Sequence, residues 1–179
     1  MELAKKLDKI KDYLKGKKVV VAFSGGSDST LLAKLAYDSA LKAVAVTVDN
    51  SVLPNDFINN AQEIAAKIGI PHEILREDFL EDDSFRLNPP QRCYICKNKM
   101  YNMLEKYLKD KHFDTILDGT NISDLLEDRP GIMVNYQKNI ITPLAYGGLT
   151  KEEVKKLLKD FNLEYSNSTT CYATRIPTG

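Results

Sequence analysis

The sequence predicts an α/β domain, a doubly wound parallel sheet of about five strands covered by helices on both faces. Short apolar, β-branched runs alternate along the chain with longer stretches in which apolar residues recur every three to four positions. That alternation is the pattern of buried parallel strands connected by helices. The 179 residues are 43% hydrophobic and 28% charged, with 9 glycines and 7 prolines, which indicates one globular domain over residues 1–179.

The first half of the chain alternates regularly between the two kinds of element. Three apolar runs predict strands, at residues 19–23, 43–48 and 72–75. Helical spacing of apolar residues predicts three helices, over residues 2–15, around residues 31–36, and over residues 54–68. Gly16 and Gly69 follow the first and third of these helices, where glycine commonly ends a helix, and Pro54 stands at the start of the third.

The second half is less regular. Residues 77–95 are acidic and then proline-bearing, without a repeating apolar pattern, and predict a loop. A helix, a fourth strand and a weak fifth strand are predicted beyond it, at residues 100–108, 115–117 and 140–141. Thr150 and Glu153 form the signature of a capping box, which predicts that a last helix follows.

Charge and composition disfavour several classes of partner. Lys+Arg and Asp+Glu number 25 each, so the formal net charge is zero, whereas nucleic-acid binders usually carry a basic excess or patch. The lysine-rich stretches, residues 5–18 and 151–159, are interleaved with acids and indicate solvated helix faces. No apolar run resembles a signal peptide or a membrane span. With 3 cysteines, an odd number, we expect a cytoplasmic protein without a structural disulfide or a membrane partner.

The candidate binding loops are those after Phe23, Val48 and Leu117, because ligands of parallel α/β sheets bind beyond the carboxyl ends of the strands. The first of these loops reads Ser24-Gly25-Gly26-Ser27-Asp28-Ser29-Thr30 and leads into a helix. Its two glycines allow a sharp turn and a close approach to an anion, and its hydroxyls add donors. The helix directs its N–H groups and positive dipole end to the same point. The loop therefore predicts a cradle for a polyphosphate.

Asp28 stands where the phosphates are expected, which fits a carboxylate that holds Mg²⁺ or caps the helix. No lysine follows the glycines, so the segment is not a Walker A loop. The alternative is a plain turn with a helix cap, since Ser and Asp are common N-caps. The position between a buried strand and a helix favours phosphate binding.

This loop resembles the PP-loop of the N-type ATP pyrophosphatases, which include GMP synthetase, NAD synthetase, asparagine synthetase and tRNA-thiolating enzymes and have an adenine nucleotide alpha hydrolase-like fold. The match to the pyrophosphate-binding motif consists of Ser24, Gly25, Gly26, Asp28 and Ser29, with Ser27 between them. The resemblance implies that a substrate oxygen attacks the α phosphorus of ATP, that pyrophosphate leaves, and that a nucleophile then displaces AMP. Val48, at the end of the second strand, is a further expected ATP contact.

Further segments resemble, in the same order, the LarE family of ATP-dependent sulfur transferases. They are RCYICK at 92–97, DGTNISDLLEDRPG at 118–131 and TTCYATRIPTG at 169–179, and they are joined by ITPL at 141–144 and TKEEV at 150–154. The resemblance implies a role in making the nickel-pincer cofactor of lactate racemase. The enzyme would adenylate a carboxylate of a pyridinium-dicarboxylate mononucleotide and convert it to a thiocarboxylate.

The LarE resemblance also implies roles for single residues. Gly119 would lie against the nucleotide, and Arg129 and Arg175 would lie near the anionic ligands. From the residues alone, Gly119 fits a turn after a strand and either arginine fits a surface ion pair equally well. Family members continue beyond a segment like CYATRIPTG into a further domain, whereas this chain stops at Gly179, so we expect that carboxyl-terminal domain to be absent.

The three cysteines have several interpretations. A disulfide between Cys93 and Cys96 is disfavoured by the expected compartment. A thioredoxin-like dithiol would stand at a helix amino terminus directly after a strand, whereas this pair follows a proline loop. A closed zinc site needs four ligands, for which only His72 and His112 supply an imidazole. Unlinked buried thiols are the structural alternative.

Three cysteine ligands fit an iron–sulfur cluster better. A [4Fe-4S] cluster held by Cys93, Cys96 and Cys171 would leave one iron open to carry an extra sulfide, as the resemblance to the three-cysteine subgroup of the LarE family implies. In the single-cysteine subgroup, the position that matches Cys171 gives up its own sulfur instead. The cluster is the favoured interpretation, and the sacrificial route stays open.

The expected activity is therefore ATP-dependent sulfur transfer, with ATP, Mg²⁺ and a [4Fe-4S] cluster as cofactors and Asp28, Cys171 and Arg175 as catalytic residues. The expected partners are a nucleotide-like carboxylate and a sulfide source, and self-association is left open. The alternatives are a tRNA-thiolating enzyme, an ammonia-using amide synthetase and a non-catalytic nucleotide-binding module. Release of pyrophosphate from ATP separates the last of these from every enzyme.

Overall fold

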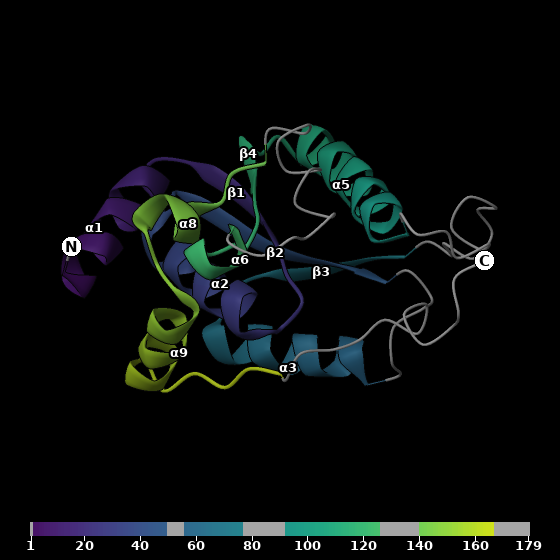
Figure 1. Cartoon of the computed structure of the whole chain (residues 1–179). Helices are drawn as coiled ribbons and strands as arrows, with labels where there is room; N and C mark the ends of the chain where they lie inside the picture. Colours follow the sequence, from purple (N-terminus) through teal and green to yellow (C-terminus); the bar gives the residue numbers. More distant parts are fainter. Residues whose placement is uncertain (1, 50–55, 77–91, 126–139, 167–179) are drawn as a thin grey trace.

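A computed structural model of the chain describes residues 2–49, 56–76, 92–125 and 140–166, with the side chains of residues 92–96 left out. Its centre is a parallel sheet of four strands, β1 (Lys18–Ala22), β2 (Lys42–Asp49), β3 (His72–Arg76) and β4 (Thr115–Leu117), in the order β3-β2-β1-β4 (Figure 1). Val20 lies opposite Val44 on one side and Ile116 on the other. The predicted α/β fold class is confirmed.

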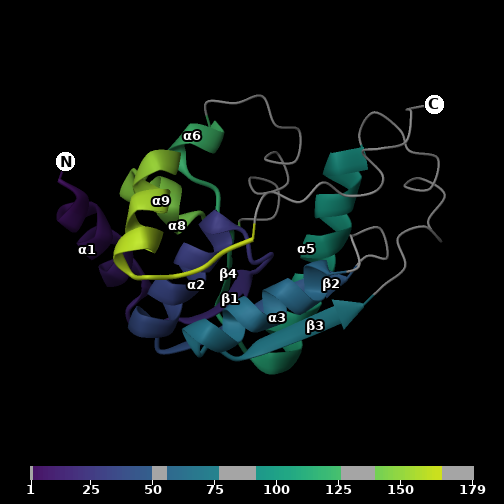
Figure 2. The ribbon, with the colours of Figure 1, turned by 90° about the horizontal axis from the view of Figure 1, so that it is seen from below.

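Helices cover both faces of the sheet. The described helices are α1 (Leu3–Leu14), α2 (Ser27–Ser39), α3 (Phe57–Ile68), α5 (Arg92–Lys111), α6 (Ile122–Leu125), α8 (Pro143–Gly147) and α9 (Lys151–Asp160). Val19 and Val21 pack with α1, α2, α3, α8 and α9, whereas Val20 packs with Tyr101 and Leu104 of α5. Figure 1 shows α5 above the sheet and α3 below it, and Figure 2 shows α1, α8 and α9 grouped away from α5. The doubly wound arrangement therefore agrees with the apolar strands, which need cover on both sides.

The predicted loop over residues 77–95 is wrong at its carboxyl end, because α5 begins at Arg92. Residues 77–91 lie outside the described residues. No proline or glycine occurs between Pro90 and Lys111, so the helix extends from its buried residue Tyr101 back through residues 97–100, which are half-buried. Those turns carry no regular apolar pattern, and for this reason the sequence placed the start of the helix too late.

The predicted fifth strand is reduced to a single bridge. Ile141 pairs in parallel with Leu117, its N–H donates to the carbonyl of Ile116 at 3.1 Å, and its carbonyl accepts from the N–H of Asp118 at 2.9 Å. Pro143 begins α8 two residues later and ends any extended segment. The described part of the sheet therefore has four strands rather than about five.

The two predicted glycine stops and the capping box are confirmed, whereas α3 starts at Phe57 rather than at Pro54, because Asp56 is its N-cap and lies outside the helix. Gly16 and Gly69 have φ values of +78° and +92°, a left-handed conformation that favours glycine. The Oγ1 atom of Thr150 accepts from the N–H of Glu153 at 3.2 Å, and Glu153 accepts from the N–H of Thr150 at 3.1 Å. This capping box also joins two helices, because Lys6 of α1 donates to Glu153 at 2.8 Å.

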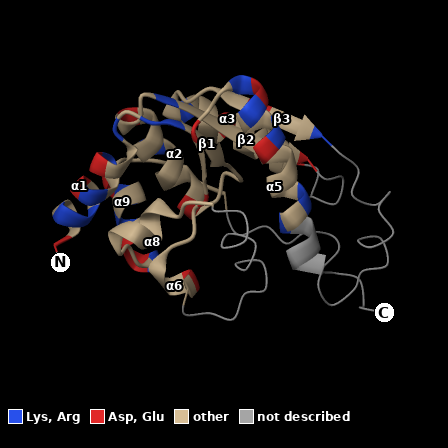
Figure 3. Cartoon of the chain, turned by 90° about the horizontal axis from the view of Figure 1, so that it is seen from above, with Lys and Arg blue, Asp and Glu red and all other residues tan. Residues whose placement is uncertain are grey.

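Charged residues of both signs are interspersed on α1 and α3 (Figure 3), in keeping with solvated helix faces. Ion pairs four residues apart, Lys34–Asp38 and Lys156–Asp160, have N–O distances of 3.1 Å. Within the described ranges, none of the helices combines the length and the apolarity needed to span a bilayer.

Candidate functional site

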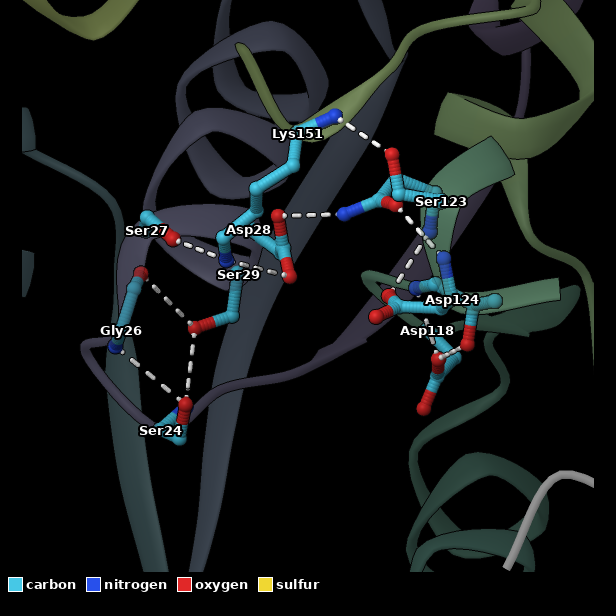
Figure 4. A network of polar contacts seen from close by, with 11 residues as sticks. Ser24, Gly26, Ser27, Asp28, Ser29, Asp118, Ser123, Asp124 and Lys151 are labelled. Atoms are coloured by element: carbon cyan, nitrogen blue, oxygen red, sulfur yellow. Dashed lines mark hydrogen bonds and ion pairs between the residues drawn. The ribbon is translucent and has the colours of Figure 1, made fainter. Parts of the chain in front are cut away.

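The candidate site lies where the chain changes direction in the sheet. From β1 the chain continues to β2 and β3 on one side, whereas β4 lies on the other side of β1. At such a point the loops after the two neighbouring strands separate and leave room for a ligand. The loops in question are the serine–glycine loop (residues 24–29), after β1, and residues 118–121, after β4 (Figure 4).

Glycine is required at Gly25 for two reasons. Its φ is +80°, and a Cβ atom there would lie 3.3 Å from the Cα of Ala61 and the Cδ1 of Ile64 in α3. The next residue, Gly26, precedes α2 and provides no side-chain cap. The first N–H groups of α2 have no acceptor within the helix, so this uncapped end can receive an anion.

The serine hydroxyls of the loop bond to one another. The Oγ atom of Ser29 accepts from the N–H of Ser24 at 3.1 Å and lies 3.1 Å from the Oγ of Ser24. The Oγ of Ser24 in turn accepts from the N–H of Gly26 at 3.3 Å. These contacts fix the shape of the turn. The hydroxyls that were predicted as donors to a ligand therefore also form hydrogen bonds within the loop.

Gly119 lies directly against the first turn of α2. A Cβ atom at this position would be 3.1 Å from the backbone carbon and the Cβ of Asp28 and 3.1 Å from the backbone nitrogen of Ser29. A side chain there would push the two loops apart. The structure thus brings the predicted residues Gly119, Asp28 and Ser29 together, and the contact of Gly119 with a nucleotide stays a prediction.

Asp28 is held by two side chains that the sequence analysis missed. Its carboxylate accepts from the Nδ2 of Asn121 at 3.0 Å and from the Nζ of Lys151 at 3.3 Å. Lys151 also donates to the Oγ of Ser27 at 2.8 Å. Burial raises the pKa of Asp28 above its ordinary value, although Lys151 and Asn121 oppose this shift. A lysine therefore reaches the loop from α9, although none follows the glycines in sequence.

Asn121 is oriented by its own neighbours. Its backbone N–H donates to Asp124 at 3.1 Å, and its Oδ1 accepts from the backbone N–H of Asp124 at 3.0 Å. The Nδ2 group is thereby directed at Asp28. Ser123 accepts from the backbone N–H of Lys151 at 3.1 Å and connects this loop to α9. Both missed residues stand in segments quoted above, DGTN and TKEEV, but only the fold reveals their shared target.

A second polar cluster lies behind the loop after β4 and is called here the Asp118 cluster, made of Lys97, Tyr101, Asp118 and Thr120. The Tyr101 hydroxyl and the Thr120 hydroxyl both donate to Asp118, as does the Thr120 N–H at 2.9 Å. Lys97 lies 3.6 Å from the same carboxylate. Burial alone would raise the pKa of Asp118, but Lys97 and the hydrogen bonds from Thr120 and Tyr101 hold it below its ordinary value.

Cys93 and Cys96 lie in the first turns of α5, so the predicted loop position of this pair is wrong. Their side chains are outside the described residues, but Lys97 follows directly and contacts Asp118 at the carboxyl edge of the sheet. Three other predicted residues, Arg129, Cys171 and Arg175, lie outside the described residues. Val48 is buried in β2 among the residues that face α5.

The histidines have structural surroundings. The Nε2 of His72 lies 2.7 Å from the Oγ1 of Thr47, which donates to the carbonyl of Phe23, and burial lowers the pKa of His72. His112 follows α5 with a φ of +61°. Among the residues that the structure describes, no three His, Cys, Asp or Glu side chains gather as a metal site.

The segment that precedes Cys171 returns to the serine–glycine loop. The N–H of Ser166 donates to the carbonyl of Gly25 at 2.8 Å. An ion pair between Lys67 of α3 and Glu164 holds the same segment. The last described residues of the chain therefore lie beside the candidate phosphate cradle.

Comparison with known proteins agrees with this geometry. The sequence pattern of the PP-loop domain family matches residues 1–176. An uncharacterized protein of Methanocaldococcus jannaschii is 32% identical over 98% of the chain and 69% of its own length. Pyridinium-3,5-bisthiocarboxylic acid mononucleotide synthase of Lactiplantibacillus plantarum is 27% identical over 90% of the chain and 60% of its own length. The latter match confirms the resemblance to the LarE family.

Other relatives act on RNA or have the same fold. A tRNA-specific 2-thiouridylase of Carboxydothermus hydrogenoformans is 25% identical over 85% of the chain and 53% of its own length. NAD synthetase of Campylobacter jejuni has a TM-score of 0.72 at 20% identity, covering 94% of this chain and 80% of its own. The U34-tRNA thiolase of Methanococcus maripaludis, solved with its [4Fe-4S] cluster, has a TM-score of 0.69 at 22% identity, covering 97% and 69%. The chain spans between about half and seven-tenths of the sequence relatives named above.

Proposed function

Because the chain belongs to the PP-loop domain family, whose members use ATP, we propose that it is the ATP-pyrophosphatase part of a LarE-type sulfur transferase of the cytoplasm. The observation that carries this proposal is the uncapped amino end of α2, which the serine–glycine loop, Gly119 and Lys151 surround. That arrangement suits the triphosphate of ATP, since it combines backbone donors, a helix dipole and one cation at a single point.

Lys151 takes the part that a following lysine has in a Walker A loop. Its Nζ lies between Ser27 and Asp28, at the end of α2 where the β and γ phosphates would sit. Asp28 would then exchange its contact with Lys151 for Mg²⁺, since Mg²⁺ in nucleotide sites is usually held by one or two carboxylates together with phosphate oxygens. The raised pKa of Asp28 supports this role, because the carboxylate is incompletely compensated without a cation.

The proposed reaction has two steps that balance. A carboxylate oxygen of the pyridinium-dicarboxylate mononucleotide attacks the α phosphorus of ATP, and the bond to the bridging oxygen of pyrophosphate breaks. A sulfide sulfur then attacks the acyl carbon, and AMP leaves with the carboxyl oxygen. Arg129 and Arg175 would balance the charge of the anionic ligands, and donors at the α2 end would stabilise the charge that develops on the phosphates.

The proposed sulfur source is a [4Fe-4S] cluster held by Cys93, Cys96 and Cys171. Thiolates are the usual ligands of such clusters, and when bound this one would supply the sulfide. Two contacts support a cluster at this edge of the sheet. Lys97, which follows the C-x-x-C pair, contacts Asp118, and Ser166, which precedes Cys171, donates to the carbonyl of Gly25. Cys171 stands five residues beyond Ser166, so the chain allows its Cα at most about 18 Å from that residue.

The test is anaerobic assay of the chain with ATP, Mg²⁺, sulfide and the pyridinium-dicarboxylate mononucleotide after reconstitution with iron. We expect equal amounts of pyrophosphate, AMP and thiocarboxylate. Cys93→Ala separates the two sulfur routes, because cluster transfer would be lost, whereas the sacrificial route would survive for one turnover and leave Cys171 lighter by hydrogen sulfide. Pyrophosphate formation without any thiocarboxylate would overturn the sulfur-transfer proposal, and no pyrophosphate at all would leave a nucleotide-binding module.

A second candidate is thiolation of tRNA, which is favoured by the similarity to the 2-thiouridylase over 85% of the chain. Against it stand the zero net charge and the mixed charges on α1 and α3. Offering unmodified tRNA and the mononucleotide in the same assay decides between them, by which acceptor stimulates pyrophosphate release. Both candidates use the same adenylation site.

A further inference from the structure

The Asp118 cluster connects the two halves of the proposed sulfur-transfer site. Asp118 faces α5, where it accepts from Tyr101 and lies 3.6 Å from Lys97. Gly119, the next residue, lies against α2 on the other face of the sheet. A Cβ atom added to Gly119 would lie 3.1 Å from atoms of Asp28 and Ser29. One short stretch of backbone therefore touches both the helix with the C-x-x-C pair and the phosphate cradle.

The contact with α5 restricts how that helix sits. Lys97 and Tyr101 are four residues apart and lie on the same face of α5, and both meet the same carboxylate. These two contacts act together with the apolar packing of Tyr101 and Leu104 on Val20, and they restrict the rotation of α5 and its position along its axis. The Tyr101 ring is fully buried, so its hydroxyl depends on Asp118 for a partner.

Cys93 and Cys96 follow the position of Lys97 closely. In an α-helix the rise is 1.5 Å per residue, which places these positions within about 6 Å of Lys97 along the axis. Residues 92–111 form one continuous helix, so we expect a displacement at Tyr101 to move its first turns as well. The cysteine pair is thus positioned from Asp118, although neither cysteine neighbours Asp118 in the sequence.

We propose that Tyr101 is a positioning residue for sulfur transfer, because its bond to Asp118 sets where the C-x-x-C turn of α5 stands relative to the adenylated substrate. This inference rests on the proposed function. It predicts that the two steps of the reaction depend on Tyr101 differently. Adenylation uses the α2 side of the loop and keeps its rate, whereas delivery of sulfur needs the correct placement of α5.

The test is Tyr101→Phe, which removes one oxygen and leaves the buried ring in place. The Asp118 carboxylate keeps its bonds from Thr120 and its pairing with Lys97. In the anaerobic assay we expect ATP–pyrophosphate exchange at the wild-type rate. The thiocarboxylate formed per pyrophosphate should fall by about tenfold or more, since small displacements of positioned groups are costly to rate.

A readout independent of activity is hydrogen exchange in α5. Loss of a buried hydrogen bond worth about 1 kcal/mol should speed exchange of amides near the start of the helix by about fivefold. The control is Tyr107→Phe, on the same helix, which removes a hydroxyl bonded to Glu73 of β3. It should loosen the other end of α5 and leave the ratio of thiocarboxylate to pyrophosphate unchanged.

The outcomes separate the inference from the proposed function. An unchanged ratio of thiocarboxylate to pyrophosphate in Tyr101→Phe overturns the inference. An equal loss of ATP–pyrophosphate exchange and of sulfur transfer also overturns it, because Tyr101 would then have a merely structural role. If the wild type releases pyrophosphate but transfers no sulfur, the proposed function has failed. Hydrogen exchange then judges the positioning contact alone, and unchanged exchange at the start of α5 would overturn it.

Discussion

Asp28 and Asp118 stand at the same edge of the sheet, after neighbouring strands, and differ in how completely they are paired. The side chain of Asp118 is 12% exposed. It accepts hydrogen bonds from Tyr101 and Thr120 and lies beside Lys97, so the pKa of Asp118 is below its ordinary value. Asp28 is 22% exposed and has Asn121 and Lys151, yet burial raises its pKa. The fold compensates the charge of Asp118 fully, whereas it compensates the charge of Asp28 only in part, which agrees with the proposed role of Asp28 as a ligand of Mg²⁺.

The same contrast appears at two helix ends. The amino end of α9 is closed by the reciprocal bonds of Thr150 and Glu153, and Ser123 accepts from the N–H of Lys151. The amino end of α2 begins at Gly26 without a side-chain cap. The closed end of α9 stabilises the structure, whereas the open end of α2 is the proposed binding site for the phosphates of ATP.

The largest effect is expected for Asp28→Asn. If Asp28 holds Mg²⁺, pyrophosphate release should fall by about 10³-fold. The folded-state pKa of Asp28 is raised, so its contribution to stability is present at low pH and is lost as pH rises through that pKa. At pH 7 the variant should therefore be at least as stable to urea as the wild type.

The matched control for that variant is Asp38→Asn, on the same helix, which breaks only the solvent-exposed pair with Lys34. It should leave both pyrophosphate release and urea stability within error of the wild type. An Asp28→Asn protein that is inactive because it unfolds more readily would contradict the assignment.

The next largest effect is expected for Lys151→Gln. Removing the lysine that reaches the end of α2 should lower pyrophosphate release by about 10²-fold, because the charge that develops on the leaving group loses a partner. Lys156→Gln is the control, since that lysine lies on α9 and pairs only at the surface with Asp160. Initial rates at saturating ATP measure the difference, and equal rates in the two variants would remove Lys151 from the site.

A smaller effect is expected for Gly119→Ala. The added Cβ would lie 3.1 Å from backbone atoms of Asp28 and Ser29, so the two loops must move apart by a few tenths of an ångström. We expect pyrophosphate release to fall about tenfold, since small displacements of positioning groups are costly to rate. Gly16→Ala is the control, because it strains a φ of +78° with open space around it and should cost only about 1 kcal/mol of stability.

Local patterns in the sequence predicted most of the fold and only part of the site. The first strand, the serine–glycine loop and the start of α2 follow one another in the sequence, so the local pattern of residues 19–29 was enough to predict this part of the site. Asn121 and Lys151 act on Asp28 from 93 and 123 positions away, and no spacing rule connects them. The helix α5 begins as early as Arg92 because its later turns are buried against the sheet. This tertiary packing leaves no apolar pattern in the polar first turns, so the sequence could not predict it.

The smallest expected effect concerns the closed side, in Asp118→Asn. The folded-state pKa of Asp118 lies below its ordinary value of 3.8, so the ionised group contributes stability that is fully present above that value and is lost as pH falls through the folded-state pKa. The variant keeps an acceptor for Tyr101 but loses the charge, which should lower the free energy of unfolding at pH 7 by about 1 kcal/mol. Urea titrations of both proteins between pH 7 and acid should converge as the wild-type carboxylate gains its proton. A difference that stays constant with pH would mean that shape, not charge, holds α5 to the loop after β4.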